Sequence, residues 1–271
     1  MKILFIGDIS GRPGRHAVRD LLPQIKNKYA IDFVIANAEN SAGGRGTTDK
    51  VLSELQSYGI DYFTSGEHIW DQKEMWDSLR DQNIPIVRPL NYEGNEHLPG
   101  DGLRIIDLGK QKIILINLLG QVFIKNPPRS PFWIFDELWE DLKNRGEVTQ
   151  NKEDNPIILI DFHAEATSEK LCFAWYVRER VSAVIGTHTH VPTADARILD
   201  NKVAYVTDVG MCGPHEASLW VDFENVINNF RFPTNKSFKM KKGGKKEFHS
   251  VLITFQKSLP NSIERVDSII K

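Results

Sequence analysis

Short apolar runs alternate with stretches of helical periodicity along the first part of this chain. The runs KILFIGD, DFVIANAEN and DYFTSGEH are separated by HAVRDLLPQIKNKY and TDKVLSELQSYG. Strands that alternate with helices of this length form βαβ units, in which helices cover both faces of a parallel sheet. The sequence therefore predicts an α/β fold.

The second part of the chain continues the pattern with different connections. LRIIDL and KIILINLLG flank GKQK like a hairpin, and a loop bearing Pro and Trp, NPPRSPFWIF, follows. Further strands are expected in IILIDFHAE, SAVIGTHTH, VAYVTDVGM and FHSVLITF, one helix around SEKLCFAWYVRER, and a short connection in PTADARILDN. We expect two sheets that share a core, with helices outside, in a single domain spanning residues 1–271.

Composition narrows the classes of function. A formal net charge of −2 gives no global attraction to nucleic acid or to an anionic membrane. Cys172 and Cys212 are too few for a disulfide framework and fit a reducing compartment. No signal peptide or membrane span is recognisable, so we expect a soluble, cytoplasmic protein.

Side chains that can bind a metal ion stand at the ends of five expected strands. They are Asp8, the pair Glu39 and Asn40, the pair Glu67 and His68, His163, and the pair His188 and His190. Ligands of open α/β sheets bind beyond the carboxyl ends of the strands, where groups distant in sequence meet. Each residue alone has an ordinary explanation, because Asp often caps a helix and a core histidine is usually just hydrogen-bonded. Helix caps that arose independently would not explain why five strand ends all carry side chains that can bind a metal ion.

The spacing of His188 and His190 is the strongest single signal, since an i, i+2 pair in an extended segment lies on one side. Oxygen and nitrogen ligands with a carboxylate able to bridge suit two ions of the Mn, Fe or Zn type about 3.5–4 Å apart. Such pairs serve phosphate ester hydrolysis. A structural zinc is disfavoured because neither cysteine falls in a C-x2-C pattern, and no G-x-S-x-G, P-loop or dinucleotide-binding motif is present.

The order and spacing of these motifs resemble the calcineurin-like metallophosphoesterases. The segments FIGDISGRPGR, ANAENSAGGRG, DFHAEATSEK, SAVIGTHTHVPTAD and TDVGMCGP resemble their YmdB-like branch of bacterial phosphodiesterases over nearly the whole chain. The resemblance implies a four-layer αββα sandwich and a centre of two divalent metal ions, iron or manganese first, with zinc or magnesium as alternatives. It also implies activity on 2′,3′-cyclic or 3′,5′-cyclic nucleotides, with RNA-linked roles.

Carried over by position, the resemblance implies two ion sites that share one carboxylate. The first would be held by Asp8, Glu39, Asn40 and His190, and the second by Glu39, His163, His188 and residue 67. His68 resembles the family's proton donor to the departing alkoxide, a role that suits a histidine of near-neutral pKa. A metal-bound hydroxide would attack, because two cations lower the pKa of bound water.

This chain departs from the family pattern at residue 67, where Gly-Asn-His is replaced by Gly-Glu-His. We expect Glu67 to face the second ion; the alternative is that it turns aside to pair with an arginine. As a ligand it would bring the charge of the centre from about +1 to about 0 and weaken the attraction for an anionic phosphodiester. The alternative to an enzyme is therefore a weakly active or noncatalytic metal-binding regulator that acts through RNA or protein partners.

Three further segments carry open alternatives. In GRPGR, Arg12 or Arg15 would capture a phosphate near the first helix, or the segment is a plain turn with a solvated arginine. The lysine-rich segment 235–248 is a solvated hairpin turning at Gly243-Gly244, or a patch for RNA phosphates. The aromatic segment 131–139 covers the site and stacks a base, or belongs to the core. The oligomeric state is left open, with a homo-oligomer among the options.

Overall fold

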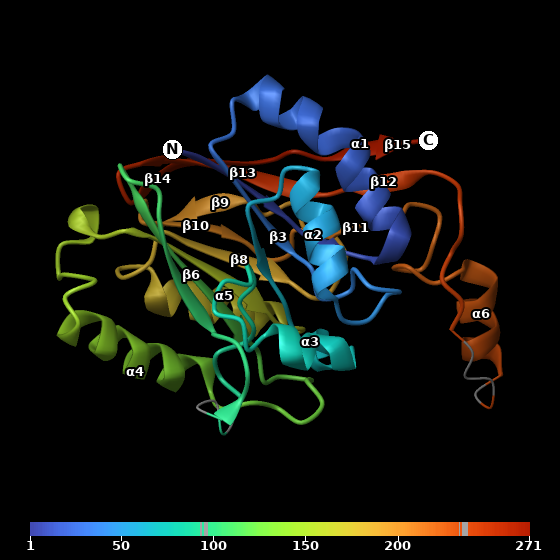
Figure 1. The fold of residues 1–271 in the computed structure, drawn as a ribbon, viewed down its shortest axis with the longest axis horizontal. Helices are drawn as coiled ribbons and strands as arrows, with labels where there is room; N and C mark the ends of the chain where they lie inside the picture. The colour runs from blue at the N-terminus through green and yellow to red at the C-terminus, as the bar shows by residue number, and fades with distance from the viewer. Residues whose placement is uncertain (93, 95–96, 233, 235–237) are drawn as a thin grey trace.

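The computed structural model describes residues 1–92, 94, 97–232, 234 and 238–271. Its main body consists of two sheets packed face to face, with helices on both outer sides (Figure 1). The first sheet has the strand order β14-β13-β1-β3-β4, and the second has the order β5-β6-β7-β8-β10-β9.

Parallel strands form the centre of each sheet. The first sheet contains β1 (Lys2–Ile6), β3 (Phe33–Asn37), β4 (Tyr62–Thr64), β13 (Ser250–Gln256) and β14 (Leu259–Arg265). The second contains β5 (Leu103–Asp107), β6 (Lys112–Leu119), β7 (Ile157–His163), β8 (Ala183–Thr187), β9 (Arg197–Leu199) and β10 (Val203–Val206). The neighbours β1, β3 and β4 are parallel, as are β6, β7, β8 and β10. The carboxyl ends of these strands therefore share an edge.

Strand β1 illustrates why the sheets share a core. Ile3 and Phe5 belong to the cluster between the two sheets, whereas Leu4 and Ile6 pack into the cluster beneath the first pair of helices. Successive side chains of a strand point to opposite faces, so a run that is apolar at every position is buried on both faces.

Four helices form the outer layers. Helices α1 (Gly11–Tyr29) and α2 (Asp49–Ser57) cover the first sheet, and α4 (Pro131–Asn144) and α5 (Thr167–Val177) cover the second. This arrangement confirms the predicted α/β class and the αββα sandwich. Two further helices are α3 (Lys73–Ser78) and α6 (Phe223–Arg231), and α6 stands apart from the main body in Figure 1. Among the described residues, no helix has the length and apolar character that crossing a membrane requires.

Several sequence expectations need correction. The expected loop around NPPRSPFWIF becomes helix α4 from Pro131 onward, because Pro is favoured at the first helical position. The segment GRPGR is the first turn of α1 rather than a separate turn. The expected connection PTADARILDN contains strand β9, and the C-terminal strand β14 was not expected.

A third, smaller sheet was also not expected. It has the order β15-β12-β11-β2 and joins β2 (Asp8–Ile9), β11 (Met211–Pro214), β12 (Lys246–Phe248) and β15 (Ser268–Ile270). The lysine-rich segment leads into this sheet. Residues 235–237 of that segment lie outside the described part of the chain. Gly243 and Gly244 both adopt positive φ, as a turn there requires, but the strand that follows pairs with β11 and β15.

Candidate metal centre

The predicted site residues converge at the carboxyl ends of strands from both large sheets. Asp8 follows β1, Glu39 and Asn40 follow β3, Glu67 opens the 3-10 helix η1 (Glu67–Trp70) after β4, His163 ends β7, and His188 and His190 follow β8. The two sheets thus contribute to one cluster, as the strand-end pattern predicted.

His163 lies at the middle of this cluster. Its Nε2 atom is 3.2 Å from Glu39 Oε1, 3.0 Å from Glu67 Oε2 and 3.1 Å from His188 Nδ1. One ligand atom from each of these four residues lies within 4.8 Å of the others. Two imidazole nitrogens and two carboxylates that face one another at such distances form a donor set for a divalent transition metal.

Asp8 and His190 lie beside this group. Asp8 Oδ1 is 3.8 Å from His190 Nε2 and 3.9 Å from His163 Nδ1. Asp8 Oδ1 and His190 Nδ1 are buried and have no hydrogen-bond partner among the described residues. Because a buried polar atom without a partner costs free energy, these atoms fit a site whose missing partner is a cation.

Asn40 has an orientation that the sequence could not predict. Its Nδ2 atom is 3.1 Å from Glu39 Oε1 and 3.2 Å from His190 Nε2. A cation binds the amide oxygen, so a ligand role for Asn40 requires the amide to be turned by about 180°, an exchange of atoms that occurs without moving the backbone.

The pKa values of the cluster reflect its burial and the closeness of carboxylates to imidazoles. Burial alone would lower the pKa of His163, but the charges and hydrogen bonds of Glu39 and Glu67 outweigh burial and raise it well above its ordinary value. Burial lowers the pKa of His190 to about 4 and raises that of Asp8. The carboxylates that raise the pKa of His163 are the same groups that would attract a cation at this place.

Glu67 points into the cluster. Besides the contact with His163, its Oε1 atom is 3.4 Å from His188 Nδ1, and it forms no ion pair with an arginine among the described residues. Burial would raise the pKa of Glu67, but the close contact with His163 and the charges of His163 and His188 lower it. The orientation is the one expected of a carboxylate that faces a second ion.

His68 lines the cleft over the cluster with one ring nitrogen engaged. Its Nδ1 atom is 3.2 Å from Asp71 Oδ2, and Arg45 contacts both Asp71 and His68, at 3.1 Å and 3.3 Å. Nδ1 therefore lies between the Asp71 carboxylate and the Arg45 guanidinium, and these two contacts fix the orientation of the ring.

A buried network that sequence reasoning missed lies beneath His163. Its Nδ1 atom is 2.8 Å from Thr187 Oγ1, which donates to Asp161 Oδ1 at 2.6 Å. Asp161 Oδ2 accepts from Asn37 Nδ2 at 2.9 Å. The available signal was Asp161 itself, a carboxylate in an apolar strand two residues before His163 and therefore on the same side.

A second missed pair supports the turn that carries His188 and His190. Lys170 Nζ on α5 lies 2.9 Å from Asp208 Oδ2 and donates to the Thr187 carbonyl at 2.7 Å. Both histidines have positive φ, 98° and 66°, a conformation that non-glycine residues rarely adopt. Surrounding contacts of this kind are needed to hold such a backbone.

The cluster opens into a cleft of about 580 Å³. Its apolar wall is formed by Leu219, Trp220 and Phe238. No residue of 131–139 lines it. Of the two alternatives for this segment, covering the site is therefore wrong and the core holds, since Phe135 and Trp139 pack beneath α4 and α5. Segment 131–139 instead forms helix α4 on the outer face of the second sheet.

The two candidate arginines of GRPGR lie outside the cleft lining. Arg15 Nη1 donates to the Ser41 carbonyl at 2.7 Å and its Nε pairs with Glu54 at 3.1 Å. Arg12 is exposed and lines a neighbouring pocket. A role for either in binding substrate stays a prediction.

The sequence profile of the YmdB-like protein family matches residues 4–266. The chain belongs to the YmdB-like family. A 2′,3′-cyclic-nucleotide 2′-phosphodiesterase of Bacillus subtilis is 45% identical over 232 residues, which cover 85% of this chain and 83% of that protein.

Solved structures agree with this membership. A novel phosphatase of Mycoplasma pneumoniae has a TM-score of 0.89 at 33% identity, covering 99% of this chain and 93% of that one. The fold alone is shared with the calcineurin-like phosphoesterase YfkN of Bacillus subtilis, with a TM-score of 0.56, 11% identity, and coverage of 99% of this chain and 90% of that one. The predicted family and metallophosphoesterase fold are confirmed, and so is a metal-dependent enzyme of the phosphodiesterase class.

Proposed function

We propose that this YmdB-like protein hydrolyses cyclic nucleotides at a centre of two divalent metal ions, with 2′,3′-cyclic nucleotides as the first substrate class and 3′,5′-cyclic nucleotides as the alternative. The observation that carries the proposal is the cluster around His163 Nε2, with Glu39, Glu67 and His188 within 3.2 Å of it. The name of the Bacillus subtilis relative supports the substrate class.

The residues fit two ions that share Glu39. One ion would be held by Asp8, Glu39, Asn40 and His190, and the other by Glu39, Glu67, His163 and His188. When bound, the ions supply positive charge that polarises the phosphoryl group and lowers the pKa of water. The mixture of carboxylate and imidazole donors suits iron or manganese, with zinc or magnesium as alternatives.

The side chains around the ions would bind and protonate the substrate. His68 Nε2 would give a proton to the departing ribose oxygen while Asp71 contacts Nδ1, the other nitrogen of the ring. Trp220 and Phe238 would contact the nucleobase from the apolar wall of the cleft. We propose that residues 1–271 act as one domain, because both large sheets contribute to this site.

We also propose a partner and a cellular location for the protein. RNA contact through residues 235–248 is supported by the lysines of the described part, 238–248. Action in the cytoplasm is supported by two free cysteines, Cys172 and Cys212.

A noncatalytic metal-binding regulator is the second candidate, and Glu67 is the observation that favours it. A third carboxylate beside the ions would make the centre less attractive to an anionic substrate while it binds metal more tightly. The contact between His68 and Asp71 favours the enzyme, because a binding protein has no need of an oriented proton donor.

One experiment separates the two. The chain is purified without chelator, its metal content is measured, and adenosine 2′,3′-cyclic phosphate and bis-p-nitrophenyl phosphate are offered with manganese or iron, with EDTA as control. We expect about two ions per chain and hydrolysis that EDTA abolishes, and His188→Ala should lose at least one ion. Full metal content without turnover would favour the regulator.

A further inference from the structure

A second pocket lies beside the metal cleft, at the start of α1. It has a volume of about 510 Å³. Among the described residues, four cationic side chains and His16 line it and no acidic residue does; the cations are Arg12, Lys241, Lys242 and Lys246. A concave surface lined by one sign of charge concentrates ions of the opposite sign.

Two of these cations have no carboxylate partner. Lys241 pairs with Asp222 at 3.3 Å and Lys246 pairs with Asp20 at 3.1 Å. The two aspartates lie outside the pocket lining. Within the described part of the chain, Arg12 and Lys242 form no ion pair, although both are exposed and line the pocket. The pocket therefore presents uncompensated positive charge, which an anion with several oxygens would satisfy.

The pocket and the metal cleft share a thin wall. Met240 lines the pocket, and its methyl group packs closely on Gly11 and Gly44. A Cβ atom added to Gly11 would lie 2.5 Å from this methyl group, and one added to Gly44 would lie 2.9 Å from it. Gly44 lines the metal cleft on the other side, together with Trp220, which also packs on Gly44. The backbone N–H of Gly11 donates a hydrogen bond to the Asn40 carbonyl at 2.8 Å.

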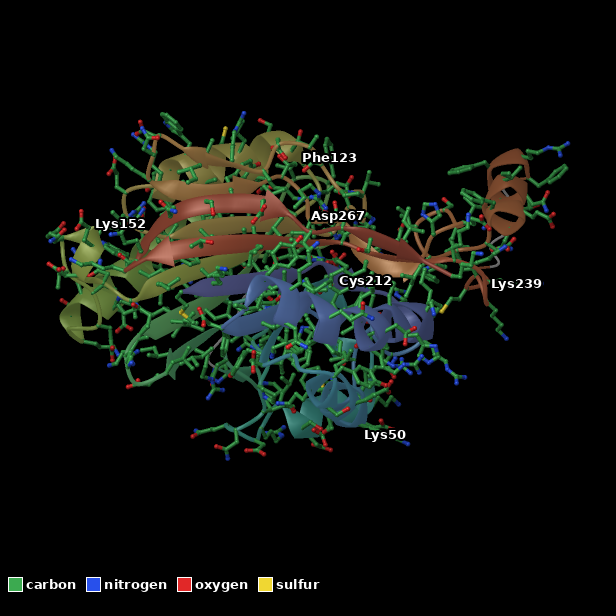
Figure 2. All side chains as sticks on the ribbon, turned by 90° about the horizontal axis from the view of Figure 1, so that it is seen from above. Lys50, Phe123, Lys152, Cys212, Lys239 and Asp267 are labelled. Carbon is green, nitrogen blue, oxygen red and sulfur yellow. The ribbon has the colours of Figure 1, made fainter. Side chains whose placement is uncertain are left out.

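The segment that carries Met240 and Lys242 reaches this place from outside the main body. Figure 2 shows Lys239 on the chain that projects beyond the sheets toward α6. This segment contributes Phe238 to the metal cleft and, a few residues later, Lys241 and Lys242 to the basic pocket. A molecule that contacts both faces of this segment would span the two cavities.

We propose that the basic pocket binds a second phosphate group of the substrate, carried by the same nucleotide whose cyclic phosphate lies at the metal centre. The inference rests on the proposed function and narrows its substrate class. The preferred substrate is then a 2′,3′-cyclic nucleotide with a phosphate on its 5′ oxygen. That phosphate is a terminal group on a mononucleotide or the diester that joins the last nucleotide to an RNA chain.

Kinetics with three substrates test the proposal. Adenosine 2′,3′-cyclic phosphate, the same nucleotide with a 5′-phosphate, and the dinucleotide ApA with a terminal 2′,3′-cyclic phosphate are compared at one salt concentration. We expect kcat/KM to be about tenfold higher for at least one of the two substrates with a second phosphate, because a charge-assisted contact is worth roughly one decade. A gain for the 5′-phosphate alone identifies a terminal phosphate, and a gain for the dinucleotide alone identifies a chain diester.

The matched variants are Arg12→Gln/Lys242→Gln and Lys50→Gln. The double variant removes the two unpaired cations, so the ratio of kcat/KM between phosphorylated and unphosphorylated substrate should fall to about one. Lys50 on α2 is exposed and lies outside both the pocket lining and residues 235–248, so its variant should keep the ratio of the natural protein. Equal kcat/KM for all three substrates in the natural protein, or an unchanged ratio in the double variant, would overturn the proposal.

A binding measurement keeps the proposal separate from the proposed function. If no cyclic nucleotide is hydrolysed, the proposed function fails, and titration calorimetry with adenosine 5′-monophosphate and with adenosine decides the pocket. Tighter binding of the phosphorylated nucleoside that is lost in Arg12→Gln/Lys242→Gln supports the pocket. Equal binding of both ligands overturns it.

Discussion

Lys170 and Asp208 form an ion pair that is buried completely, with Nζ 2.9 Å from Oδ2. The same two groups hold the backbone on both sides of His188, because Lys170 donates to the Thr187 carbonyl and Asp208 accepts from the backbone N–H of Thr189 at 3.0 Å. Helix α5 is thereby tied to the turn that presents the metal-binding histidines. The pair touches no proposed ligand atom and is a positioning device.

Lys170→Met should lower both stability and metal affinity. Removing one partner of a buried pair leaves an uncompensated charge and typically costs about 3–5 kcal/mol. The double variant Lys170→Met/Asp208→Leu should recover part of the free energy of unfolding, since an apolar pair avoids the desolvation penalty, yet bind metal poorly. Denaturant unfolding and metal titration measure the two effects.

The control for this prediction is Lys152→Met, which removes a half-buried ammonium that donates to the carbonyls of Arg178 and Lys202, away from the centre. It should cost stability and leave metal affinity unchanged. Recovery of metal affinity together with stability in the Lys170→Met/Asp208→Leu variant would show that the pair serves folding alone.

His68→Ala should reduce turnover by ~10²–10⁴-fold for a substrate with a poor leaving group, because general acid catalysis contributes about that much. The loss should be smaller for bis-p-nitrophenyl phosphate, whose leaving group needs little protonation. Asp71→Asn should produce a smaller loss with the same dependence on leaving group, because Asp71 contacts His68 Nδ1 at 3.2 Å. Losses independent of the leaving group would exclude His68 as the proton donor.

Glu67→Asn should raise the positive charge of the centre by one and accelerate phosphodiester hydrolysis at saturating metal. A change of one unit in the pKa of bound water corresponds to roughly tenfold in rate. Metal should bind more weakly, because a carboxylate is replaced by an amide. Rates measured against metal concentration separate the two effects.

The matched variant for Glu67 is Glu165→Gln. Glu165 contacts His188 Nε2 at 3.1 Å but lies outside the group of four around His163. It should change the saturated rate less than Glu67→Asn does. If Glu67→Asn leaves both saturated rate and metal affinity as they are in the natural protein, Glu67 is not a ligand.

His249 should make stability depend on pH. Burial would lower its pKa, but the carboxylates of Asp267, 3.2 Å from Nδ1, and of Glu247, 3.6 Å from Nε2, outweigh burial and raise the pKa to about 8 from an ordinary value of 6.5. Because the folded value is the higher one, the stabilisation is complete below about pH 6.5 and is lost as pH rises through about 8. The loss amounts to ~2 kcal/mol.

Urea unfolding at pH 6 and pH 9, in EDTA so that metal binding does not contribute, measures this loss. His249→Gln should be less stable at pH 6 and should show a smaller difference between the two pH values. An equal difference in both proteins would assign the pH dependence to other groups.

The sequence predicted the strands and the polar residues at their ends because both depend on local pattern. Asp8 and His163 follow apolar runs, and parallel strands must bring their carboxyl ends to one edge. It did not predict the Lys170–Asp208 pair, since a lysine in a helix is ordinarily solvated and its partner lies 38 residues away. The small sheet was missed for a similar reason, because β11 pairs with β2 and β12 from opposite ends of the chain.

The left-handed backbone at His188 and His190 gives this turn a use in comparing relatives. Each such residue costs of order 1–3 kcal/mol that glycine would not incur. Selection for stability alone would therefore replace these histidines with glycine, and only the need for imidazole opposes it. In a family member that has lost its metal-dependent activity, glycine at either position is the substitution to expect. The residues of this turn would then indicate whether a relative is still an active metal-dependent enzyme.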